Sequence, residues 1–102
     1  MDPCLPADCR TLNEVRAGVD ALDRELVALV ARRFEYMRAA ARIKRTRESV
    51  RDEARKTAVV AAARAEAERL GAPAGRVEAL WDTLVESSIA FELDEWDRRH
   101  RL

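Results

Sequence analysis

Residues 12–45 read LNEVRAGVDALDRELVALVARRFEYMRAAARIKR, a stretch without proline in which Gly18 is the only glycine. Thr11 and Glu14 have the spacing of a capping box, which predicts a helix start near Leu12. Steps of three and four residues connect one face, as in a single helical stripe. That face consists of Val15, Val19, Leu22, Leu26, Leu29, Arg33, Met37, Ala40 and Lys44. The stretch therefore predicts one long helix over 12–45.

A helix of that length exceeds the width of a globule built from 102 residues. At 1.5 Å per residue it would be roughly 50 Å long. A partner chain is the simplest structure that would cover its apolar stripe, because a chain this short buries little surface alone. We therefore expect a homodimer.

The remainder of the chain predicts two more helices. Polar residues 46–50 indicate a loop, and an alanine-rich face predicts a second helix over about 52–70. Gly71 is its expected C-cap and Pro73 blocks continuation. A third helix is predicted over about 74–99. The expected fold is all-α, with an N-terminal tail over 1–10 and one helical domain over 11–102.

Composition narrows the function classes. The chain has 19 basic and 19 acidic residues, so it lacks the basic surplus typical of nucleic-acid binders. No stretch approaches the ~20 apolar residues of a membrane helix, and the first ten residues do not resemble a signal peptide. Cys4 and Cys9 are expected to be free thiols. We therefore expect a cytoplasmic protein that binds neither nucleic acid nor membrane.

Two predicted helices carry polar residues on their apolar faces. Arg33 and Lys44 are eleven residues apart on the first helix, and Ser88 and Glu92 are one turn apart on the third. Buried charges need partners, so these groups pair with each other or with a ligand. Alternatively, the aliphatic parts of Arg33 and Lys44 are buried while their charged groups extend into water, or the two cations pair with Glu92 as a structural salt bridge. Cations that converge in an apolar bundle favour a small dianion as ligand.

These positions resemble a known family. The run Leu12-x-x-Val-Arg16-x-x-Val-Asp20-x-x-Asp23-x-x-Leu26-Val-x-Leu29, followed by Arg32-Arg33 and Lys44, is similar to the first helix of the all-helical (AroQ-type) chorismate mutases. Val50-Arg51-Asp52 with Arg55, and Ser88-Ile-Ala-Phe-Glu92, resemble its later motifs. The resemblance covers residues 9–97 and implies an intertwined homodimer of three-helix chains.

The resemblance also implies roles for individual residues. Arg16, from the partner subunit, and Arg33 would hold the two carboxylates of a chorismate-type substrate. Lys44 and Glu92 would bind the ether oxygen whose bond breaks. Further contacts to the substrate would come from Arg55, Ser88 and Asp52. The implied [3,3] rearrangement of chorismate to prephenate needs substrate folding and charge stabilisation, with no metal or cofactor. His100, the one histidine, is expected to be structural.

Three features depart from the mutase pattern. Glu92 stands where many bacterial relatives have Gln, and it would have to be protonated to donate a hydrogen bond to an ether oxygen. Lys56 stands where typical mutases have a Glu that binds the ring hydroxyl, and the segment from Lys44 to Arg55 is one residue shorter. Lys56 and the short segment resemble the isochorismate–pyruvate lyases of salicylate synthesis.

The sequence therefore leaves alternatives open. It places chorismate mutase first, because the family includes acid-dependent mutases that have Glu at the position of Glu92. The lyase follows, then an enzyme that rearranges 4-amino-4-deoxychorismate. A non-catalytic helical dimer with structural cations is the alternative from a different class. Trp81 and Trp96, large aromatics on the third helix, are expected to pack in the core.

Overall fold

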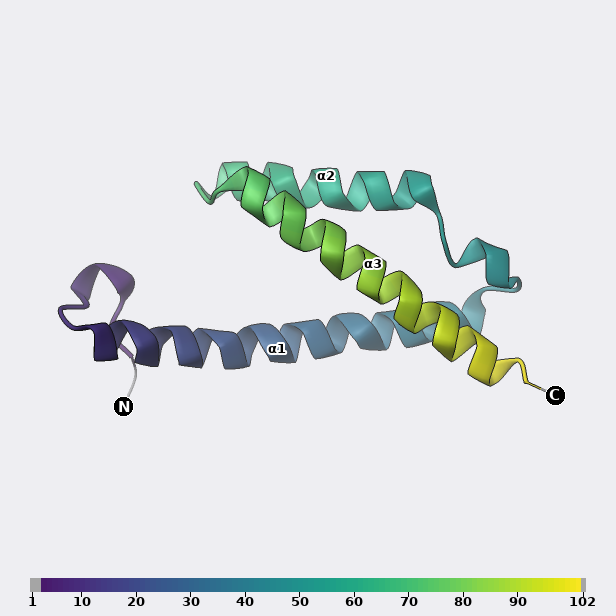
Figure 1. Cartoon of the computed structure of the whole chain (residues 1–102), viewed down its shortest axis with the longest axis horizontal. Coiled ribbons are helices and arrows are strands. Elements are labelled where there is room, and N and C mark those ends of the chain that lie inside the picture. The colour runs from purple at the N-terminus through teal and green to yellow at the C-terminus, as the bar shows by residue number, and fades with distance from the viewer. Residues whose placement is uncertain (1–2, 102) are drawn as a thin grey trace. The chain divides into compact units, whose positions relative to one another are not determined.

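Three α-helices make up most of the described part of the chain (Figure 1). The computed structural model describes residues 3–101. The helices are α1 (Leu12–Ile43), α2 (Glu53–Arg69) and α3 (Ala74–Arg99), with two short 3-10 turns, η1 (Pro6–Asp8) and η2 (Arg47–Ser49). The described residues contain no strand, so the all-α prediction with three helices is confirmed. The first helix ends two residues before the predicted end.

The chain forms two compact units, residues 1–35 and 36–102, and each is described by itself. α1 begins in the first unit and ends in the second. The second unit also contains η2, α2 and α3. The single helical domain expected over 11–102 stays a prediction.

The start of α1 is capped as its sequence predicts. The Thr11 hydroxyl oxygen accepts a hydrogen bond from the Glu14 N–H at 3.1 Å. The Glu14 carboxylate accepts in turn from the Arg10 N–H at 3.3 Å and from the Thr11 hydroxyl at 3.2 Å. These bonds satisfy amide groups that a helix start leaves without partners.

The end of α2 is fixed by a glycine. Gly71 has φ +72°, a left-handed conformation that favours glycine. Its N–H donates to the Glu68 carbonyl at 3.2 Å, and the Ala72 N–H donates to the Ala67 carbonyl at 2.8 Å. This pair of bonds is a Schellman motif. The predicted C-cap is therefore confirmed, and the chain turns into α3 after Pro73.

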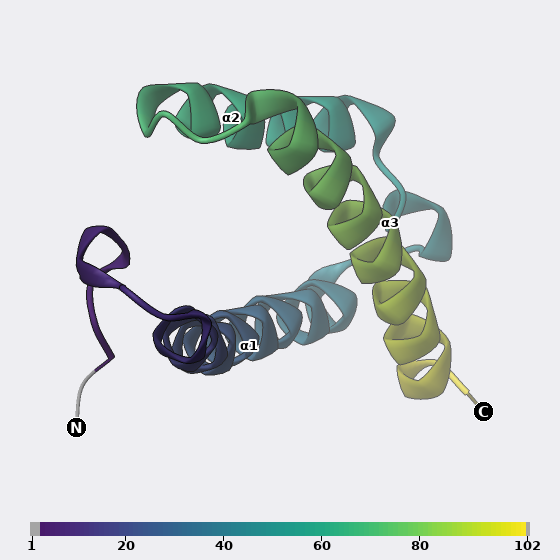
Figure 2. The same cartoon turned by 60° about the vertical axis from the view of Figure 1, so that its left-hand side comes forward.

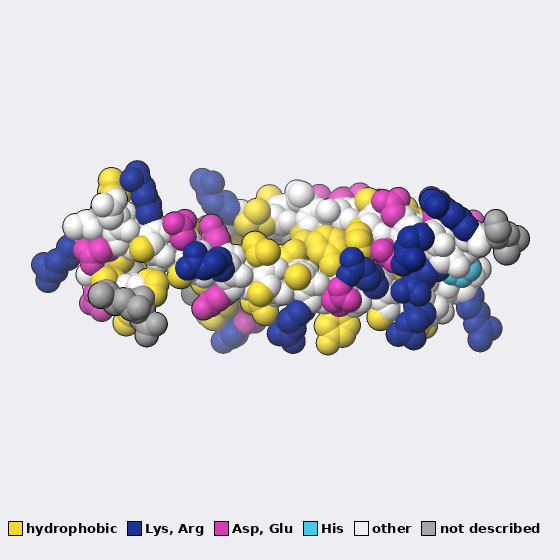
Figure 3. Space-filling model, turned by 90° about the horizontal axis from the view of Figure 1, so that it is seen from below, with side chains coloured by type: hydrophobic (Ala, Val, Ile, Leu, Met, Phe, Trp, Pro, Cys, Tyr) yellow, Lys and Arg dark blue, Asp and Glu magenta, His cyan; other side chains and the backbone are white. Residues whose placement is uncertain are grey.

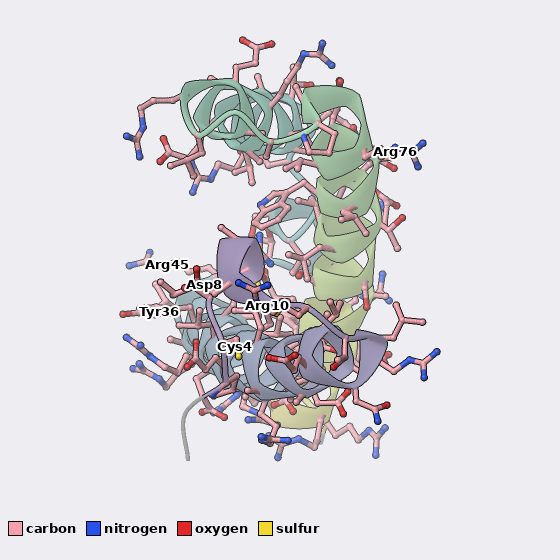
Figure 4. All side chains as sticks on the ribbon, turned by 90° about the vertical axis from the view of Figure 1, so that its left-hand side faces the viewer. Cys4, Asp8, Arg10, Tyr36, Arg45 and Arg76 are labelled. Atoms are coloured by element: carbon pink, nitrogen blue, oxygen red, sulfur yellow. The ribbon has the colours of Figure 1, made fainter. Side chains whose placement is uncertain are left out.

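In the first unit, the N-terminal segment folds back along the start of α1. Cys4, which Figure 4 labels, donates from Sγ to the Glu14 carboxylate at 2.9 Å. Its carbonyl oxygen lies 4.0 Å from the position that a Cβ on Gly18 would take. Cys4 and Cys9 are both free thiols, as expected.

The apolar stripe of α1 is exposed in the first unit. Leu22 is 55% exposed and Leu29 is 54% exposed, although both are large hydrophobic side chains. Val15, Val19 and Leu26 of the stripe are exposed too, as are Leu12, Val27 and Val30 elsewhere on the helix. The face of the chain in Figure 3 shows hydrophobic side chains between Arg and Lys side chains. None of the described helices is long and apolar enough to span a membrane.

The second unit has its core between α2, α3 and the end of the loop before α2. Figures 1 and 2 show the two helices close together at residues 70–73 and diverging from there. The buried residues Val50, Val85 and Ile89 form the centre of this core. Partly buried side chains pack around them, namely Val59, Val60, Trp81, Leu93 and Trp96. Both tryptophans therefore pack in the core, as expected.

Candidate active site

The centre of the candidate site is an ion pair between the end of α1 and the middle of α3. Lys44 Nζ lies 2.7 Å from Glu92 Oε2 and also donates to the Val50 carbonyl at 3.4 Å. Glu92 is 4% exposed, whereas the Lys44 side chain is 30% exposed. A buried carboxylate thus holds the ammonium group of a partly exposed lysine side chain.

Helical periodicity places Glu92 in this position. Val85, Ser88 and Glu92 follow one another at helical spacing on α3, and all three are buried. The sequence placed Ser88 and Glu92 on an apolar face of the third helix, and the structure confirms that both are buried. Among the described residues, no buried side-chain oxygen or nitrogen lacks a hydrogen bond, so the polar members of the stripe satisfy the rule that buried polar groups are paired.

The main chain of Lys44 is fixed on both sides. Its N–H donates to the Ala40 carbonyl at 2.8 Å, which continues the helical pattern by one residue beyond Ile43. Its carbonyl oxygen accepts a hydrogen bond from Trp96 Nε1 at 3.1 Å. The sequence predicted that Trp96 packs in the core, but it gave no sign of this bond.

His100 supports the same tryptophan. Its ring stacks on the Trp96 ring, with 3.7 Å between centroids and 13° between planes. Its Nδ1 lies 2.7 Å from the Trp96 carbonyl oxygen. These contacts are consistent with the structural role expected for the histidine.

Ser88 is 2% exposed, and its hydroxyl donates to the Leu84 carbonyl at 2.7 Å. A serine hydroxyl bonded to the carbonyl four residues earlier is a common arrangement within helices. The hydroxyl oxygen can also accept a hydrogen bond. The contact of Ser88 with substrate stays a prediction.

Asp52 and Arg55 both lie at the start of α2 and are exposed. The Asp52 carboxylate accepts a hydrogen bond from the Arg55 main-chain N–H at 2.9 Å, so Asp52 is the N-cap of this helix. Sequence analysis missed the capping role, although Asp before a helix is a recognisable signal. Substrate contacts of these two side chains stay predictions.

The two arginines of the expected carboxylate clamp lie on α1 in the first unit. Arg16 is exposed, and Arg33 is half-buried. Their convergence with Lys44 and Glu92, and the contribution of Arg16 to a partner subunit, stay predictions.

A second lysine site lies between α2 and α3. Lys56 Nζ lies 2.8 Å from Glu86 Oε2 and 3.1 Å from Asp82 Oδ1. Arg51 donates two hydrogen bonds to the Glu86 carboxylate, at 2.8 and 3.0 Å. Hydrogen bonds from Arg51, and then from Lys56, lower the pKa of Glu86 to about 2. Hydrogen bonds to Glu86 and Asp82 raise the pKa of Lys56. Sequence analysis noticed Lys56 but missed these partners.

The loop between α1 and α2 is also tied to the end of α3. Arg47 donates to Asp97 at 2.8 and 3.2 Å, a bidentate arrangement. The hydrogen bond from Arg47 lowers the pKa of Asp97. Because Val50 is buried in the core, both ends of η2 are held against the helices.

Within residues 3–101, no group of three His, Cys, Asp or Glu side chains is placed to hold a metal ion.

Comparison with known proteins assigns the chain to a class of enzymes. The family model "Chorismate mutase type II" matches residues 15–93, which include α2 and most of α1 and α3. The chain therefore belongs to the chorismate mutase type II family, and the predicted resemblance is confirmed. It is also 30% identical over 91 residues to an isochorismate pyruvate lyase from Pseudomonas aeruginosa. This match covers 89% of the chain and 90% of the relative. The protein is thus an enzyme of the chorismate-mutase type.

Proposed function

We propose that the protein breaks the enolpyruvyl ether bond of a chorismate-type dicarboxylate, with Lys44 and Glu92 at the ether oxygen and without a cofactor. The observation that carries this proposal is the 2.7 Å contact between the ammonium group of the partly exposed Lys44 side chain and the buried Glu92 carboxylate. A preorganised cation aimed at a developing negative charge is the main means of catalysis for such a reaction.

The other residues in the proposal bind and fold the substrate. Arg33 and the partner subunit's Arg16 would hold the two carboxylates, because guanidinium groups match carboxylates bidentately. Arg55, Ser88 and Asp52 would contact the ring. Holding a flexible enolpyruvyl group over its ring removes much of the entropic barrier of a unimolecular reaction.

Of the two reactions on this fold, we propose the isochorismate–pyruvate lyase first. The ether C–O bond would break while a ring hydrogen moves to the enolpyruvyl methylene carbon, which leaves salicylate and pyruvate. Position 56 supports this choice, since the Lys56 ammonium is held by Glu86 and Asp82 and cannot accept a bond from a ring hydroxyl as the mutase Glu would. The near full-length similarity to a lyase adds to it.

Chorismate mutase is the second candidate, and sequence analysis placed it first. Its specific support is Glu92, which matches acid-dependent mutases, together with the family model that fits the chain. In that reaction the same ether bond breaks while a carbon–carbon bond forms to the ring. The lyase moves ahead because position 56 and the full-length relative both favour it.

A homodimer is part of the proposal. The apolar stripe of α1, with half-exposed residues such as Leu22 and Leu29, supports a second copy as its cover. Such a dimer would bring the Arg16 side chain of each chain to the site of the other. A cytoplasmic location, and the absence of nucleic-acid and membrane partners, stay predictions.

The test is to incubate the purified protein separately with isochorismate and chorismate, and to quantify salicylate, pyruvate and prephenate. The proposal predicts salicylate and pyruvate in equal amounts from isochorismate, with slower turnover of chorismate. Prephenate as the main product would favour the mutase instead. Turnover of neither substrate would contradict the proposal and favour the non-catalytic dimer.

A further inference from the structure

Lys44 is the residue at which three elements of the second unit meet. It follows the last residue of α1, its ammonium contacts α3, and the same ammonium donates to Val50 at the end of η2. A lysine side chain has four rotatable bonds, so its ammonium position depends on how well the main chain is held. The main-chain contacts of Lys44 therefore bear on any chemistry at Nζ.

Trp96 provides the contact from α3 to that main chain. Its Nε1 donates to the Lys44 carbonyl at 3.1 Å, while Glu92, one turn earlier on α3, holds Nζ at 2.7 Å. Two consecutive turns of one helix thus hold opposite ends of the same residue. Carbonyl groups at the end of a helix have no partner within that helix, so the indole N–H satisfies a group that would otherwise need water.

The tryptophan is itself held in place from two sides. Its ring packs against the buried cluster of Val50, Val85 and Ile89. His100 stacks on the ring at 3.7 Å between centroids. The indole therefore has little freedom to turn away from the Lys44 carbonyl.

We propose that Trp96 is a positioning residue for catalysis, because its indole N–H fixes the main chain of Lys44 and thereby aims Nζ at the reacting oxygen. The proposal rests on the proposed function for the identity of the reaction, but the positioning of Lys44 can be measured without it. Trp96 acts through Lys44 and needs no contact with substrate.

Trp96→Phe removes the N–H and keeps an aromatic ring, and Trp81→Phe is the matched control. Trp81 packs against the same cluster, and the structure of the described residues gives its indole no hydrogen bond. We expect Trp96→Phe to lower kcat about tenfold with little change in KM, since small misplacements of a catalytic group lower the rate steeply. Trp81→Phe is expected to leave kcat within about twofold of the wild type.

The readout independent of turnover uses the fact that Lys44 and Lys56 are the only lysines. Protein labelled with 13C,15N-lysine gives one set of NMR signals from each, which Lys56→Arg assigns. We expect Trp96→Phe to shift the Lys44 side-chain signals and leave those of Lys56 in place, and Trp81→Phe to move neither set.

The two readouts separate the two proposals. Unmoved Lys44 signals in Trp96→Phe overturn the positioning role, whatever happens to the rate. An equal fall in kcat for Trp96→Phe and Trp81→Phe overturns it too, because a general packing defect would then explain both. If the wild type turns over neither substrate, the proposed function fails, while the shift of the Lys44 signals still supports the positioning of this lysine by Trp96.

Discussion

The two lysines of the chain form ion pairs of nearly equal length in different surroundings. Lys44 lies 2.7 Å from Glu92, and Lys56 lies 2.8 Å from Glu86. Glu92 is buried, with a side chain 5% exposed, whereas the Glu86 side chain is 40% exposed. Distance alone therefore does not distinguish these pairs, but the burial of the carboxylate does.

The surroundings also differ in how the charges are shared. Glu86 receives Arg51 as well as Lys56, and Lys56 has Asp82 as a second acidic partner. This network joins α2 to α3 at the surface, where water and salt screen it. Glu92 lies among the buried residues of α3 and holds the ammonium group of a side chain that is 30% exposed. In the proposed function the buried pair acts at the reacting oxygen, whereas the network around Lys56 holds α2 against α3.

Lys44→Ala should have the largest effect. We expect turnover to fall by on the order of a hundredfold or more, as when one group that stabilises the developing charge is removed. We also expect the free energy of unfolding to fall by about 2–3 kcal/mol, because Glu92 is left buried without its cation; the partial exposure of Lys44 keeps this below the range for fully buried pairs. Initial rates and urea unfolding measure the two effects.

Lys56→Ala is the matched control for that variant. It removes a half-buried lysine from a network in which Arg51 still binds Glu86, and it leaves the pair of Lys44 and Glu92 in place, so we expect a much smaller loss of turnover than in Lys44→Ala. Its loss of stability should be smaller than that of Lys44→Ala. Equal losses of turnover in the two variants would remove the distinction between the pairs.

Glu92→Gln tests the buried pair at its acidic side. An amide can donate a hydrogen bond, whereas an ionised carboxylate can only accept one. If donation from position 92 to the ether oxygen limits the reaction, Glu92→Gln should turn over substrate faster than the wild type at pH 7.5. Initial rates of the two proteins at that pH measure this, and a slower variant would show that such donation does not limit the reaction.

Glu86→Gln tests the exposed network and should have the smallest effect. Since the folded-state pKa of Glu86 is lowered to about 2, its ionised form stabilises the fold above its ordinary value of 4.5. That contribution is lost as the pH falls toward about 2. The variant should therefore be less stable than the wild type near neutral pH, and this difference should shrink on acidification. Urea unfolding at several pH values measures it, and a constant difference would contradict the expected role of Arg51 and Lys56.

Local signals in the sequence were sufficient to predict most of the helix bounds. Thr11 and Glu14 marked the start of α1, and Gly71 marked the end of α2, because caps depend on neighbouring residues. The predicted third helix has the bounds of α3. The end of α1 was predicted two residues late, since Lys44 and Arg45 are good helix formers and nothing in the sequence shows where the turn to η2 begins.

The candidate site was predictable only where periodicity revealed it. The stripe of Val85, Ser88 and Glu92 followed from helical spacing, and the pairing of Lys44 with Glu92 was one of the options. The bond from Trp96 to the Lys44 carbonyl joins residues 52 positions apart. Such a bond depends on the packing of α3 against the end of α1, which single-sequence patterns do not encode. The partners of Lys56, Asp82 and Glu86, could not be predicted for the same reason, because their contacts depend on the packing of α2 against α3.

The most direct test of the central claim is whether ligand reaches Lys44. Salicylate and pyruvate, the expected products, are titrated into protein labelled with 13C,15N-lysine, and the two lysine side chains are followed by NMR. We expect the Lys44 signals to shift with saturation while those of Lys56 stay in place. Movement of Lys56 alone, or of neither lysine in a protein that turns over isochorismate, would contradict it.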